Sequence, residues 1–180
     1  MRFIVLLLIS LLTSCATAPN KVAHVTPYKL NHVYIEPTTN RTAEESLDVI
    51  FTRVANEVFY SDPRFKVDRV PQPAVTVVVK PEVRSISTFA VGFDRYDRVT
   101  EYRMEITTNV KLIRYGFNRP LATFTVSRYD FYSTKGTASE IEQRRKECIE
   151  RIAYEIFREV AEKIFVEGAE IESANETGGQ

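Results

Sequence analysis

The sequence has few of the residues on which enzyme and metal sites are usually built. It contains two cysteines, six glycines and two histidines, and the histidines, His24 and His32, both lie near the N-terminal end. It has no zinc-ligand spacing, no glycine-rich phosphate loop and no G-x-S-x-G nucleophile turn. We therefore expect no catalytic residue, no metal site and no cofactor, and predict that the protein is not an enzyme.

An excess of charge of one sign is also missing. The chain has 24 basic and 24 acidic residues, which give a formal net charge of zero. Net charge therefore predicts no nucleic-acid partner.

The N-terminal fifteen residues read as a bacterial lipoprotein signal. Arg2 is followed by an apolar run too short to span a bilayer, and then by Leu12-Thr13-Ser14-Cys15. This pattern predicts a signal peptide over residues 1–14 and lipidation of Cys15, although a secreted protein with a chance cysteine would look similar. Acyl chains would hold the protein on a membrane. Because Ala16 stands where an Asp would favour inner-membrane retention, we expect a periplasm-facing outer-membrane location.

The other cysteine, Cys148, then has no disulfide partner within the chain. It falls on the apolar side of a predicted helix. A buried structural thiol is therefore favoured over a reactive one.

The rest of the chain divides into three segments. Residues 15–31 contain Pro19 and Pro27 without a periodic pattern, which indicates a lipidated tether. Residues 32–167 carry the periodic segments and are predicted to form one folded domain. Residues 168–180 are acidic and poor in apolar side chains, so we expect a disordered tail.

The first half of the domain shows short elements around one helix. His32–Ile35 and Phe65–Val67 are short strand candidates, and Val75–Val79 is a β-branched strand. Thr42-Ala43-Glu44-Glu45 has capping-box spacing, which predicts a helix from Thr42 to the stop at Ser61-Asp62-Pro63. Pro81 indicates a bulge or an edge position.

The second half contains the clearest patterns. Apolar residues alternate with polar ones from Tyr102 to Leu112, and a second strand continues to about Tyr132. From Ser139 to Glu167 the period becomes that of a helix, which Gly168 is placed to end. The order predicts an α+β two-layer sandwich, with two amphipathic helices packed on one face of a mixed sheet of about four strands.

Positive charge gathers in the strand region. Residues 80–128 hold nine basic residues against five acidic ones, with Phe89, Phe93, Tyr96 and Tyr102 among them. Arginine forks beside aromatic rings suit an amphiphile that bears phosphate and acyl groups. Alternatively, these are solvated strand faces whose cations pair with neighbouring carboxylates. Thr88–Arg98 is either an exposed hairpin tip or a strand pair that packs Phe89 and Val91 into the core.

Taken together, the lipobox, the helix with Leu47, Ile50 and Val54, and the long strand that opens Thr100-Glu101-Tyr102 resemble the LptE family of lipopolysaccharide-assembly lipoproteins. The resemblance implies a plug that supports an LptD-like outer-membrane β-barrel and binds lipopolysaccharide. By position, Arg95 and Arg98 match the basic residues implicated in that contact, with Phe93 beside them. Lys135 matches a further basic position after the last strand.

Two other functions fit the same anchor and domain. One is an auxiliary lipoprotein of an envelope lipid ABC transporter, which would contact the periplasmic subunits of the transporter. The other is a structural envelope adaptor, which would leave the basic loop without a ligand.

Overall fold

The computed structural model describes residues 30–177, with side chains to Gly168. The signal peptide, Cys15, most of the tether and residues 178–180 lie outside the described residues. The elements are β1 (His32–Ile35), β2 (Thr39–Asn40), α2 (Leu47–Ser61), β3 (Lys66–Val67), β4 (Val77–Phe93), β5 (Val99–Arg114), β6 (Pro120–Ser133) and α3 (Ala138–Thr177). Within residues 30–177, no helix combines the length and hydropathy needed to cross a bilayer.

The sheet is mixed, with strand order β3-β1-β4-β5-β6 and β2 paired to β4 beyond the end of β1. β4, β5 and β6 form the expected antiparallel meander, whereas β1 runs parallel to β3 and β4. The expected number of about four strands was too low, since the sheet has six. The difference arises from β2 and β3, which have two residues each and are too short to show a period.

Pro81 lies inside β4 at a break in its outer edge. The Glu36 amide donates to the Val79 carbonyl, and the Arg41 amide donates to the Val83 carbonyl. The nitrogen of Pro81 faces the same edge between these two bonds, where β1 has ended and β2 begins. The missing N–H therefore costs no hydrogen bond.

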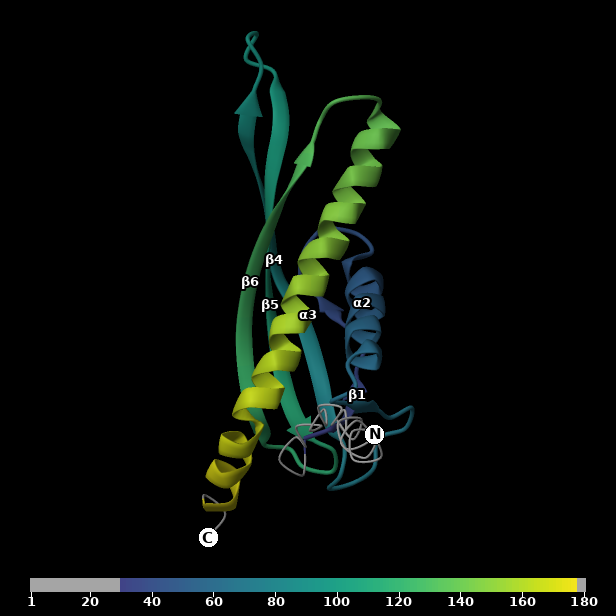
Figure 1. The fold of residues 1–180 in the computed structure, drawn as a ribbon, viewed down its shortest axis with the longest axis vertical. Coiled ribbons are helices and arrows are strands. Elements are labelled where there is room, and N and C mark those ends of the chain that lie inside the picture. The colour runs from purple at the N-terminus through teal and green to yellow at the C-terminus, as the bar shows by residue number, and fades with distance from the viewer. Residues whose placement is uncertain (1–29, 178–180) are drawn as a thin grey trace, which may run out of the picture.

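Both helices pack on one face of the sheet, as predicted (Figure 1). The alternation on β5 places Met104, Ile106, Val110 and Leu112 in the core. Phe51 of α2 meets Phe157 of α3 edge to face, with ring centroids 5.9 Å apart. Cys148 is fully buried among them, which confirms the structural thiol.

The predicted start of α2 was wrong. The helix begins at Leu47, after Ser46 in a left-handed conformation with φ 63°. The Thr42 hydroxyl accepts from the Glu44 amide at 3.2 Å and donates to the Asn40 side chain at 2.8 Å. These short-range bonds hold a turn in place of a capping box.

The capping box instead opens α3. The Thr137 amide donates to a Glu140 carboxylate oxygen at 2.7 Å, and the Glu140 amide donates to the Thr137 hydroxyl at 3.3 Å. At the other end, Gly168 does not stop the helix, which continues to Thr177. The predicted disordered tail from residue 168 was therefore wrong for the backbone up to Thr177.

The β4–β5 hairpin extends past the start of α3 and past the start of α2 (Figure 1). β4 is buried or half-buried from Val77 to Val83 and mostly exposed from Arg84 to Phe93. Its pairing with β1 and β2 ends at Val83, so the upper part has only β5 as a neighbour. This geometry places the segment around Arg95 at one extremity of the molecule.

Candidate functional site

Backbone and side-chain hydrogen bonds around Asp94 shape the tip of the hairpin. The Asp94 amide donates to the Arg98 carbonyl at 2.9 Å, and the Asp97 amide donates to the Asp94 carbonyl at 3.1 Å. Asp97 itself has φ 58°, a left-handed conformation that Asp tolerates. A four-residue turn whose last residue is left-handed is a common way to close a hairpin. The tip is thus an ordered loop that projects the intervening side chains.

The Asp94 carboxylate fixes one of the two predicted arginines. It accepts from the amides of Tyr96 and Arg98, at 2.8 and 3.1 Å, and pairs with the Arg98 guanidinium at 2.7 Å. The hydrogen bond from the Arg98 side chain, with help from the two amides, lowers the pKa of Asp94. The ion pair with Asp94 therefore occupies part of the Arg98 guanidinium, which leaves Arg98 only partly available to a ligand.

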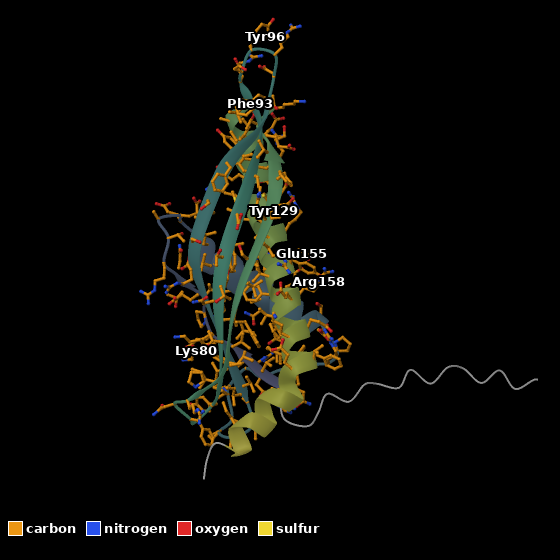
Figure 2. The ribbon with its side chains drawn as sticks, turned by 90° about the vertical axis from the view of Figure 1, so that its left-hand side faces the viewer. Lys80, Phe93, Tyr96, Tyr129, Glu155 and Arg158 are labelled. Carbon is orange, nitrogen blue, oxygen red and sulfur yellow. The ribbon has the colours of Figure 1, made fainter. Side chains whose placement is uncertain are left out.

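Arg95 differs from Arg98 in having no acidic partner among the described residues. Its guanidinium lies 4.7 Å from the centroid of the Tyr96 ring, and that of Arg98 lies 5.4 Å from the same ring. Tyr96 is 62% exposed, so the ring separates two cations in water. Figure 2 shows Tyr96 at the end of the hairpin. The sequence pattern did not single out Tyr96 as the residue whose ring lies beside both arginines.

The other two predicted residues, Phe93 and Lys135, lie at the same end of the sheet as the arginines. Phe93 ends β4 opposite Val99 and is 57% exposed. Lys135 follows Thr134, whose amide donates to the Thr100 carbonyl at 3.0 Å, and this places Lys135 at the foot of the projecting hairpin. The Lys135 carbonyl accepts from Arg144 of α3, which ties that connection to the helix.

Most other cations of the strand region are paired, as the alternative interpretation expects. Arg103 pairs with Glu105, a neighbouring carboxylate on the same strand, at 2.7 Å. The remaining pairs are Lys80 with Glu36, Arg84 with Glu82, and Arg128 with Glu159. Four cations along the strands are thus neutralised, and at the tip Arg98 is paired with Asp94 while Arg95 has no acidic partner among the described residues.

The described residues offer little for bond-making chemistry. They contain no cluster of His, Cys, Asp or Glu that could hold a metal ion. His32 lies 3.2 Å from the Asp68 carboxylate, which also accepts from the Thr76 hydroxyl at 2.6 Å, and this network joins β1 to the connection before β4. Burial raises the pKa of the Cys148 thiol to about 11. The arrangement at the tip is suited to binding anions.

A family model described as "Lipopolysaccharide-assembly", that of LptE, matches residues 30–166. The chain belongs to the LptE family. The matched region covers every described strand, α2 and most of α3. Membership supports a role in lipopolysaccharide assembly, in agreement with the resemblance noted in the sequence.

Solved structures share the fold of this LptE-family chain at low sequence identity. Rare lipoprotein B from Shewanella oneidensis is 15% identical, with a TM-score of 0.51, and the match covers 81% of this chain and 99% of that one. An uncharacterised lipoprotein B from Nitrosomonas europaea is 11% identical, with a TM-score of 0.54 and coverage of 82% and 90%. A search of curated protein sequences gives no match. Identities this low establish the fold alone.

Proposed function

We propose that this LptE-family protein is a lipid-anchored outer-membrane protein that plugs and supports an LptD-like β-barrel. In this role it binds lipopolysaccharide during assembly into the outer leaflet. The hairpin tip is the proposed binding site, formed by Arg95 and Arg98 with Phe93 beside them and Lys135 at the foot of the hairpin. The observation that supports the proposal is the Arg95 guanidinium, which has no acidic partner among the described residues and lies at the exposed end of the hairpin.

The Arg95 guanidinium at the tip is suited to a phosphate group. A guanidinium presents a planar fork of donors that fits a phosphate with two parallel hydrogen bonds. Arg95 has all of its donors available among the described residues, whereas Arg98 shares some with Asp94. A phosphate would therefore bind first to Arg95 and recruit the free edge of Arg98.

The position of the tip suits a protein that is anchored at its other end. β1 begins beside the start of β4, with Val33 opposite Val77, whereas the tip follows the end of β4 at Phe93. The β4 strand has 17 residues, a length of roughly 50 Å at the usual rise of a strand. With a lipid on Cys15, the tether would hold one end of the domain near the membrane and direct the tip away from its attachment point.

The direct test is lipopolysaccharide binding by a full-length Arg95→Ala, Arg98→Ala double variant. We expect an affinity loss of about tenfold or more, since hydrogen bonds to charged groups contribute roughly 1.5–3 kcal/mol each. The unfolding midpoint should stay close to that of the wild type, because both side chains are exposed. Titration onto immobilised lipopolysaccharide measures the first quantity, and thermal unfolding measures the second.

A matched control removes two positive charges at the opposite end of the sheet. Lys111 lies low on β5, and Arg119 lies in the β5–β6 turn. A Lys111→Ala, Arg119→Ala variant has the same net charge as the tip variant and should bind as the wild type does. Unchanged binding by the tip variant, or equal losses in the two variants, would contradict the proposed site.

A further inference from the structure

Exposed aromatic side chains from β4 and β6 lie on the helix-free face of the sheet, below the tip and on either side of β5. Phe89, Arg103 and Phe131 stand in register across β4, β5 and β6. Tyr129 lies two residues before Phe131 on β6, on the same face and opposite Glu105. The three rings, which we call the aromatic row, are each at least 41% exposed: Phe89, Tyr129 and Phe131.

Side-chain contacts order the aromatic row and neutralise its charge. Tyr129 and Phe131 meet edge to face with centroids 5.7 Å apart, and the Arg103 guanidinium lies 4.0 Å over the Tyr129 ring. The same guanidinium pairs with the Glu105 carboxylate at 2.7 Å. Arg103 thus lies over the Tyr129 ring with its charge balanced by Glu105, so the row presents a largely apolar surface without a net positive charge.

The aromatic row is continuous with the proposed phosphate site. Val91 and Phe93, both exposed, follow Phe89 on β4 towards the tip, across two register shifts in the pairing with β5. Four residue steps separate Phe93 from Phe89, which corresponds to roughly 13 Å at the rise of a strand. Figure 2 shows Tyr96 and Phe93 at the end of the hairpin and Tyr129 further down the sheet. Along this path the surface changes from cationic to neutral and apolar.

We infer that the aromatic row holds acyl chains of the same amphiphile whose phosphates bind at the tip. This inference rests on the proposed function. An amphiphile carries its anionic groups and its apolar chains in a fixed order, and the hairpin presents a free cation and then an exposed apolar strip in that order. Exposed apolar strips of this kind mark interaction sites on otherwise soluble surfaces. Continuity with the cationic tip favours a lipid over a separate protein partner.

The test compares two probes that share a headgroup: intact lipopolysaccharide and fully deacylated lipopolysaccharide. A full-length Phe89→Ser, Phe131→Ser variant should lose about tenfold or more in affinity for the intact probe. Its affinity for the deacylated probe should stay within about twofold of the wild-type value. The single Phe89→Ser variant, which changes one exposed side chain, should show the same selectivity with a smaller loss.

Two further variants make the result specific. Phe117 and Tyr115 are exposed at the opposite end of the sheet, and a Phe117→Ser, Tyr115→Ser variant should bind both probes as the wild type does. The Arg95→Ala, Arg98→Ala variant should lose affinity for both probes.

The outcomes distinguish failure of the acyl-chain site from failure of the proposed function. If the tip variant loses both probes and the Phe89→Ser, Phe131→Ser variant binds intact lipopolysaccharide normally, the acyl-chain site is overturned and the proposed function stands. If the wild type binds neither probe, the proposed function fails and the inference fails with it. If the Phe89→Ser, Phe131→Ser variant keeps lipid binding and instead loses a co-purifying barrel, the row is a protein-docking surface and the inference is overturned.

Discussion

The two halves of the β4–β5 strand pair share one backbone hydrogen-bond ladder, but they differ in the neighbours of β4 and in the exposure of its side chains. In the lower half, β4 from Val77 to Val83 lies beside β1 and β2 and contributes buried valines to the core. In the upper half, from Arg84 to Phe93, the same strand has one neighbour and carries exposed serine, threonine and aromatic side chains. The change occurs at the register shift between Val83 and Ser85.

The comparison shows how one strand pair can serve both stability and binding. Side chains in the lower half are buried, so their removal should change the free energy of unfolding. On the helix-free face of the upper half, side chains such as Phe89 are exposed, so their removal should change binding and leave the fold intact. The opposite face still contributes Met104 and Ile106 of β5 to the core. Substitutions that obey or break this division are the sharpest tests of it.

The largest expected effect is on stability, from a residue that packs against the lower half. Phe157→Ala removes a fully buried ring that contacts Phe51, and we expect a loss of about 3–5 kcal/mol in the free energy of unfolding. Phe89→Ala is the matched control in the upper half and should cost no more than about 0.5 kcal/mol. Urea denaturation followed by circular dichroism measures both. Equal costs would show that the upper half is packed in solution.

A smaller effect should distinguish the two segments with capping-box spacing. Thr137→Ala removes the hydroxyl that accepts a hydrogen bond from the Glu140 amide. We expect a loss of about 1 kcal/mol in the free energy of unfolding. Thr42→Ala removes only turn contacts to Asn40 and Glu44, so we expect a smaller loss. Denaturation of both variants under one set of conditions ranks them. A greater cost for Thr42→Ala would contradict the assignment of the capping box to α3.

The smallest effect is local and depends on pH. The pKa of Asp94 in the folded protein is lowered below its ordinary value of 3.8, chiefly by the Arg98 side chain. The carboxylate contacts are therefore complete above pH 3.8 and are lost as the pH falls through the lowered pKa. The Tyr96 amide resonance, which reports a bond to that carboxylate, should shift in the same range in a two-dimensional NMR titration.

The Arg98→Ala variant supplies the control for this titration. Without the guanidinium, the midpoint of the Tyr96 shift should move up towards 3.8. A midpoint that does not change would show that Arg98 does not hold Asp94 in solution.

The sequence predicted the elements whose side-chain pattern is long enough to repeat. The alternation from Tyr102 to Leu112 and the helical period after Ser139 both correspond to observed elements, and the meander follows from their order. The two-residue strands β2 and β3 were beyond such reasoning, because a pair of residues has no period. Gly168 did not end α3, since a glycine without a following reversal of the chain lowers helix stability and does not forbid the helix.

The candidate site was predictable in position and less so in detail. The basic, aromatic segment Thr88–Arg98 indicated either an exposed tip or a strand pair with Phe89 and Val91 in the core. In the structure Phe89 and Val91 are exposed, and Phe93, Arg95 and Arg98 lie at the tip. What the pattern could not show is which arginine is neutralised. Asp94 and Asp97 are both close in sequence, and only the turn geometry selects the Asp94–Arg98 pair.

The most direct test of the account is affinity isolation of the full-length protein from detergent-solubilised membranes, followed by mass spectrometry of the proteins that co-elute. We expect one large outer-membrane β-barrel protein of the LptD kind to co-elute in stoichiometric amount. Recovery of inner-membrane transporter subunits in its place would contradict the account and would favour an auxiliary lipoprotein of an envelope lipid transporter.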